Sequence, residues 1–341
     1  MKGECQRRLS ISDTMIETIH LVTTRSINPL GTLHGGVALR WMITAGSMAS
    51  MRVARSPTLI AHLDHVFFLN PVRLGKNAVV TAWVELVGRT SMELTVLLEE
   101  EDPITGERTL STAAHMTYVA VDERLRPRPV GACIEPANQQ ERMLQERALE
   151  RRRHRSPRKD VHDIELPRPI VPGASRSTHR LVNPEDTLAY NAMHGGRLMH
   201  IMDELSGIVA ISYARGPVVT AAVDATDFLT PILVGKILGV HAALTYTGRT
   251  SMEITVKAIV EDPDTGELRK AASSYFTMVH LGPDWKPKPV PQPTLTEEWQ
   301  LKLAEEARKR RERRREMLEF FRQSITEIKP PRRDDIGPRQ E

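Results

Sequence analysis

The chain has 341 residues, of which 40% are apolar and 4% aromatic, and its formal net charge is +4. This length allows two hydrophobic cores, which must be mainly aliphatic. No apolar run is as long as a membrane span, and the first 14 residues contain no apolar signal core, so we expect a cytoplasmic protein. Basic residues concentrate in segments 141–159 and 302–315, and the charge elsewhere is balanced, which argues against a general nucleic-acid-binding surface.

The two cysteines, Cys5 and Cys133, lie near the start of the chain and in a linker. Their spacing matches no metal-ligand pattern, and we expect neither a metal nor a cofactor. Two isolated cysteines of this kind are typical of proteins in a reducing compartment.

In chain order, residues 1–13 are expected to be disordered, and residues 15–22 alternate weakly, as in a strand. A loop rich in turn-forming residues leads to Gly35 and Gly36, and the nearly uncharged sequence from 37 to about 53 predicts a helix. Further strands are predicted at 58–68, 77–87, 92–100 and 109–121. One apolar helix with one antiparallel sheet predicts an α+β domain whose sheet curls around the helix.

This pattern occurs twice. His34-Gly-Gly recurs at His194-Gly-Gly, 160 residues later, and about a third of the positions from Leu21 to Val119 are identical at that offset. The repeated unit is a whole domain, so the chain carries a duplication. The second helix is apolar almost all round and should be buried, yet it contains one carboxylate, Asp203.

Each unit continues into a Pro-rich, charged tail. We predict charged helices at 139–155 and 295–323, each solvated and stabilised by pairs of opposite charge one turn apart. RNA binding through these Arg-rich helices is an alternative reading. The last residues, 328–341, are expected to be disordered.

The two copies differ in an informative way. Asp203 aligns with Ile43 in the first copy, and Asn28 aligns with Leu188 in the second. If the units pair about a pseudo-twofold axis, two equivalent clefts form, each from the loop of one unit and the helix of the other. One holds Asn28 and Asp203 (the polar cleft), and the other holds Leu188 and Ile43 (the apolar cleft). We therefore predict one working site and one that has lost its chemistry.

The residues of the polar cleft suit hydrolysis. Gly35 and Gly36 open a helix, so their N–H groups lack helical partners and are suited to binding an oxyanion. Asp203, with its pKa raised by burial, would serve as general base for a water, and Asn28 would orient the water or the carbonyl.

Structural roles remain open for several of these residues. Asn28 is also a turn former before Pro29, and the glycines also permit close helix packing. His34 and His194 occur in both copies, so we interpret them as helix caps rather than catalysts.

Together these motifs resemble the hotdog-fold acyl-CoA thioesterases, and the tandem arrangement is similar to the cytosolic double-hotdog acyl-CoA hydrolases. The motifs are Asn-Pro-Leu-Gly-Thr-Leu-His-Gly-Gly, Met-Asp-Glu on the helix, Asp-x-x-x-Phe-Leu-x-Pro and Gly-Arg-Thr-Ser-Met-Glu. The resemblance implies hydrolysis of fatty acyl-CoA to fatty acid and CoA. It also implies an Asp on one central helix, here Asp203, an Asn in the partner loop, here Asn28, and a helix-end glycine, here Gly35 or Gly36.

The resemblance further implies a trimer of double-hotdog chains. It gives hotdog domains at 10–125 and 171–285, with linker 126–170 and tail 286–341. Arg89 and Arg249 are candidates for binding the CoA phosphates, with solvated surface arginine as the equal alternative. Other functions considered are a hotdog hydratase/dehydratase and a non-catalytic acyl-CoA-binding regulator.

Overall fold

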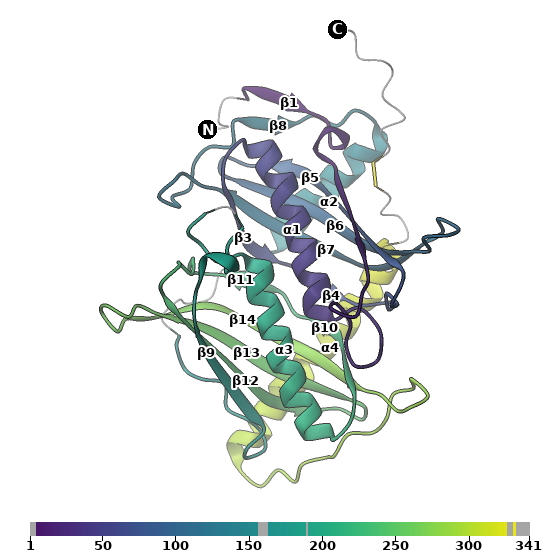
Figure 1. The fold of residues 1–341 in the computed structure, drawn as a ribbon, viewed down its shortest axis with the longest axis vertical. Helices are drawn as coiled ribbons and strands as arrows, with labels where there is room; N and C mark the ends of the chain where they lie inside the picture. The colour runs from purple at the N-terminus through teal and green to yellow at the C-terminus, as the bar shows by residue number, and fades with distance from the viewer. Residues whose placement is uncertain (1–4, 156–162, 189, 326–329, 332–341) are drawn as a thin grey trace.

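The computed structural model describes residues 5–155, 163–188, 190–325 and 330–331. Figure 1 shows two similar units, each with one long helix against a curved antiparallel sheet. The first unit contains α1 (Gly35–Ala54), β2 (Ile16–Leu21), β3 (Thr58–Leu63), β4 (Val66–Phe67), β5 (Asn77–Val87), β6 (Ser91–Glu101) and β7 (Arg108–Ala120). The second contains α3 (Gly195–Ala214), β9 (Ser175–Leu181), β10 (Val218–Val223), β11 (Thr226–Phe228), β12 (Ile237–Thr247), β13 (Ser251–Glu261) and β14 (Leu268–His280). This confirms the predicted α+β fold with two tandem hotdog domains.

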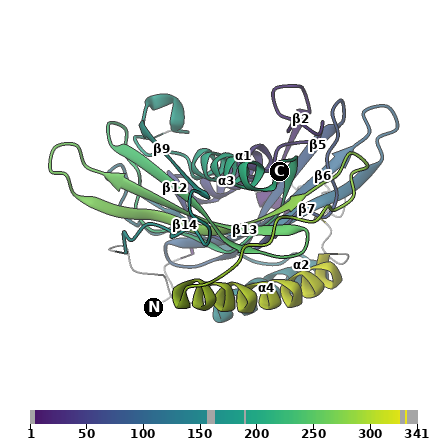
Figure 2. The ribbon, with the colours of Figure 1, turned by 90° about the horizontal axis from the view of Figure 1, so that it is seen from below.

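The two sheets join into one of 12 strands. Two strand pairs make the junction: β3 lies antiparallel to β11, with Leu63 opposite Thr226, and β4 lies antiparallel to β10, with Phe67 opposite Ala222. In this way each unit covers the sheet edge that it would otherwise expose. Figure 2 shows both central helices on the concave side of the joint sheet.

The central helices meet at their glycines. A Cβ on Gly36 would stand 3.0 Å from the Cα of His200, and a Cβ on Gly196 would stand 2.9 Å from the Cα of Arg40. The two contacts are the same contact after the 160-residue offset, so the units are related by a pseudo-twofold axis, as predicted. The glycines therefore do serve close packing between α1 and α3.

The sequences predict central helices that are buried on all sides, and this prediction is wrong. Met48 of α1 and Ile208 and Ile211 of α3 are 39%, 49% and 42% exposed. The sheet curls around only part of each helix, so apolar side chains of both helices stay exposed in the chain.

Two charged helices lie on the opposite face of the sheet, α2 (Gln139–His154) and α4 (Glu298–Ile325) (Figure 2). The prediction that they are simply solvated is wrong. The carboxylate of Glu141 is buried and accepts the N–H groups of Ile11 and Ser12, each at 3.0 Å. On α4, Arg314 lies 2.9 Å from Glu253 and also binds Asp224. Hydrogen bonds to the buried Glu141 thus dock α2, and ion pairs of Arg314 dock α4.

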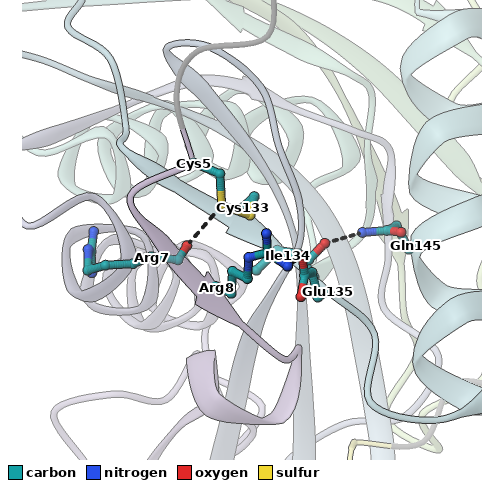
Figure 3. Close-up of a disulfide and its surroundings, with 7 residues drawn as sticks. All are labelled: Cys5, Arg7, Arg8, Cys133, Ile134, Glu135 and Gln145. Atoms are coloured by element: carbon teal, nitrogen blue, oxygen red, sulfur yellow. Dashed lines mark hydrogen bonds and ion pairs between the residues drawn. A yellow bond between two sulfur atoms is a disulfide. The ribbon is translucent and has the colours of Figure 1, made fainter.

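The start of the chain is also ordered, against expectation, from residue 5 onward. Strand β1 (Arg7–Leu9) lies parallel to β8 (Ala132–Ile134), and this brings Cys5 and Cys133 together in a disulfide with a Cα–Cα distance of 5.6 Å (Figure 3). The two cysteines, which look isolated in the sequence, are therefore not isolated in the fold. Pairing between strands so short and so far apart leaves no pattern in the sequence. Residues 1–4 and 332–341 lie outside the described residues.

The helix crossing generates a stability prediction. We expect Gly196→Ala to lower the free energy of unfolding by about 1–3 kcal/mol, because its Cβ would overpack the backbone of α1. Gly207 in the same helix has nothing within 4 Å of the Cβ position, so Gly207→Ala should raise the free energy of unfolding, by up to about 1 kcal/mol, through helix propensity alone. Thermal unfolding followed by circular dichroism measures both, and a stabilising Gly196→Ala would contradict the close crossing.

Candidate active site

The pseudo-twofold axis relates two cavities at the junction of the units. The polar cleft has a volume of about 400 Å³ and is lined by Asn28, Gly35 and Thr220, among others. The apolar cleft has a volume of about 220 Å³, and Leu188, Gly195 and Ile60 lie on its wall. Both clefts combine residues of the two units, as predicted.

Asp203 lies directly behind the wall of the polar cleft and is 1% exposed. Its Oδ2 accepts the N–H of Gly36 at 2.6 Å, and its Oδ1 accepts the hydroxyl of Thr220 at 2.7 Å. Burial raises the pKa of Asp203, and the neighbouring His34 and these two hydrogen bonds oppose the rise. The carboxylate is therefore desolvated and also held in one orientation.

Gly35 keeps this carboxylate open to the cleft. A Cβ on Gly35 would stand 3.3 Å from Asp203 Oδ2 and 2.9 Å from the Thr220 hydroxyl oxygen. Any side chain at this position would therefore crowd the carboxylate. The N–H of Gly36 is already donated to Asp203, so of the two helix-opening groups the N–H of Gly35 is the one left for a ligand.

His34 acts as a helix cap, as predicted: its Nδ1 accepts the N–H of Gly36 at 3.1 Å. It also lies 3.3 Å from Asp203 Oδ2. Its ring packs edge-on against His200, whose pKa is lowered to about 4 by burial and by nearby positive charges. His194 makes no cap bond, and its Nε2 lies 3.3 Å from Ser47 Oγ. The interpretation as a cap therefore holds for His34 only.

Asn28 lines the polar cleft and also folds its own loop. Its Oδ1 accepts the N–H groups of Leu30 at 2.9 Å and Thr32 at 3.3 Å, and its Nδ2 donates to the Thr32 hydroxyl at 2.9 Å. The turn-forming role is therefore real. The amide carries a second hydrogen, so turn formation does not use all of its donors.

The sequence comparison missed Thr220. It stands where the first unit has Ile60, so a third position repeats the pattern of one polar and one aliphatic member. The mismatch between Thr220 and Ile60 is present in the sequence, but Thr220 lies in a strand, where an isolated threonine is common. In the apolar cleft, the aliphatic Ile43 and Ile60 stand at the positions of Asp203 and Thr220, so neither the carboxylate nor the hydroxyl is present there.

The two arginines suggested for CoA phosphates are not brought together. Arg249 lines a cavity of about 360 Å³ beside α4, with Arg311. Arg89 holds the equivalent turn of the first unit, where its carbonyl accepts the N–H of Val130. Within the described residues, no group of three or more His, Cys, Asp and Glu side chains is arranged to hold a metal. In that same part of the chain, no helix is long and apolar enough to cross a membrane.

Comparison with known proteins agrees with this architecture. The family model of the thioesterase superfamily matches residues 30–107 and 190–267, once in each unit. The cytosolic acyl coenzyme A thioester hydrolases of Mus musculus and Homo sapiens are each 32% identical, over 83% of this chain and 78% and 79% of their own lengths. An acyl-ACP thioesterase from Bacteroides thetaiotaomicron is 11% identical with a TM-score of 0.50 and covers 79% of this chain and 100% of its own, which supports the fold alone. The chain therefore belongs to the thioesterase superfamily and carries two copies of its domain.

Proposed function

We propose that this protein hydrolyses fatty acyl-CoA to free fatty acid and CoA in the polar cleft, with one such site per chain. The observation that carries the proposal is the buried carboxylate of Asp203, held across the junction by the helix-opening N–H of Gly36 and within its own unit by Thr220. The related hydrolases named above act on acyl coenzyme A thioesters, and they match most of this chain. Their names also call them cytosolic, and we propose the same location here.

The mechanism follows from the donors and acceptors of the cleft. The thioester carbonyl binds at the N–H of Gly35, at the positive end of α1, where charge on its oxygen is stabilised as the tetrahedral intermediate forms. Asp203 takes a proton from the attacking water, and the intermediate then expels the CoA thiolate, which receives that proton back from Asp203. Thr220 and Gly36 keep the carboxylate aimed, and the free amide hydrogen of Asn28 orients the water or the carbonyl.

The first test removes the base. Asp203→Asn keeps the shape of the side chain but cannot take a proton, so we expect turnover to fall at least 10²-fold, about 2.7 kcal/mol of transition-state stabilisation. The measurement is thiol release from acyl-CoAs of graded chain length. Ile43→Ala, at the equivalent position of the apolar cleft, is the matched control and should act through packing alone. An equal loss of turnover at Ile43 would contradict the single site.

A second test separates the two roles of Asn28. Asn28→Asp keeps the oxygen that accepts from Leu30 and Thr32 but removes the amide donor. We expect a fully folded protein with turnover lowered roughly 10²-fold, the size of effect seen when one transition-state donor is lost. Thermal unfolding checks the fold. Unchanged turnover would leave Asn28 as a turn residue only.

The pH dependence follows from Asp203. Burial raises the pKa of Asp203 above its ordinary value of 3.8, so activity should fall with decreasing pH at a higher pH than for a solvated Asp. The stability effect has the opposite sign. A raised folded-state pKa favours the protonated form, so the wild type should lose stability relative to Asp203→Asn as pH rises through that pKa. Rate profiles and unfolding curves across pH measure both, and an acid limb at 3.8 or below would count against a buried base.

We further propose that the chain assembles as a homotrimer. Ile208 and Ile211 lie one turn apart on α3 and are both exposed, which supports association, because contiguous exposed apolar surface marks interaction sites. Light scattering on the purified protein gives the number of chains directly.

A further inference from the structure

A basic cavity lies behind the polar cleft, on the sheet face that α4 covers. It has a volume of about 290 Å³, and its wall includes Arg311, Arg315 and Arg322 of α4 and Thr277 of β14. The hydroxyl oxygen of Thr277 is buried and has no hydrogen-bond partner. The cavity therefore combines positive charge with an unused polar group.

The arginines of α4 divide into two sets. Arg310 and Arg314 face the sheet and are neutralised by Glu253 and Asp224, at distances of 2.7 to 2.9 Å. Within the part of the chain that the structure describes, no acidic side chain forms an ion pair with Arg311, Arg315 or Arg322. The first set docks the helix, and the second leaves net positive charge in the cavity.

This cavity adjoins the polar cleft. Phe68, Leu69 and Ala221 line both cavities, so only their thickness separates the two. The cavity that holds Arg249 also continues the basic surface, since it shares Tyr246 and Arg311 with the basic cavity. A substrate with its thioester at Asp203 would thus lie close to cavities that are lined by several arginines.

Behind the apolar cleft, the described residues, which do not include 156–162, show no equivalent cluster. In the first unit, Arg152 of α2 lies against Gly88 as Arg311 lies against Gly248. However, α2 ends at His154, and the next arginine, Arg155, is paired with Glu93 at 2.8 Å. Helix α4 runs further and crosses to the first unit, where Phe321 packs on Phe67 with ring centroids 5.4 Å apart. The arginines of the basic cavity and the polar residues Asn28, Asp203 and Thr220 therefore lie on the same side of the pseudo-twofold axis.

We propose that Arg311, Arg315 and Arg322, together with Arg249, bind the diphosphate and the ribose phosphate of the CoA moiety. This rests on the proposed function. CoA carries its phosphates at the end of a long flexible arm, so its polyanion must bind away from the reacting carbonyl. Guanidinium groups suit this task because they stay charged and donate paired hydrogen bonds to phosphate oxygens. Arg89, on the other side of the axis, has no part in it.

The test compares substrates with and without phosphates. The triple variant Arg311→Ala, Arg315→Ala, Arg322→Ala should raise KM for acyl-CoA at least roughly tenfold, the effect of losing one or more charged hydrogen bonds, with kcat unchanged. The same acyl group on pantetheine has no phosphates, and its kcat/KM should not change. The charge-matched control is Arg152→Ala, Arg308→Ala, Arg313→Ala, which removes three arginines that do not line the cavity and should leave both substrates unaffected.

Direct binding of CoA separates this proposal from the proposed function. By calorimetry, the triple variant should bind CoA at least tenfold more weakly than the wild type, and the wild-type affinity should fall more steeply with salt. Unchanged CoA binding, or an equal loss for acyl-CoA and acylpantetheine, would overturn the assignment. A wild type that binds CoA through these arginines but hydrolyses neither thioester would instead refute the hydrolase and leave the phosphate site standing.

Discussion

The structure depends on one hydrogen bond between units, from the N–H of Gly36 on α1 to the carboxylate of Asp203 on α3. A carboxylate that is 1% exposed is costly unless its oxygens are satisfied. Here one hydrogen bond comes from Thr220 of the same unit and the other from Gly36 of the opposite unit, and the second requires the two helices to approach at glycine. The same contact thus fixes the pairing of the units and places the acid beside the cleft, while burial raises the pKa of the acid and the hydrogen bond from Gly36 opposes that rise. Neither unit alone contains the complete site.

Because the two units are related by a pseudo-twofold axis, their differences can be compared position by position. The backbone contacts at the helix crossing and at the strand junctions have been kept on both sides. The chemistry has been kept on one side only, by three polar positions whose counterparts are Leu188, Ile43 and Ile60. On the apolar side, an aliphatic side chain removes the need to satisfy a buried charge. The apolar cleft therefore has no buried charge to satisfy at these positions.

Much of this could be predicted from the sequence, because the duplication acts as an internal comparison. The spacing of apolar residues in the helices and strands predicts the α+β domain. The positions at which the copies differ, Asp203/Ile43 and Asn28/Leu188, point to residues of one cleft. What escaped prediction depends on contacts between distant segments. The composition of the Arg-rich helices predicts that they are solvated. Nothing in it shows that arginines of α4 form ion pairs with Glu253 and Asp224. Likewise, only the crossing geometry shows that the N–H of Gly36 is taken by Asp203 and that Gly35 is left.

The bond between Cys5 and Cys133 has a topological consequence. The two residues are 128 positions apart, and nearly all of the first unit lies between them. When the bond is formed, that unit is a closed covalent ring, while the second unit is an open chain attached to it. A single backbone cut inside the ring releases no fragment, whereas a cut in the second unit severs the chain. The two halves, alike in fold, thus differ in how they respond to proteolysis.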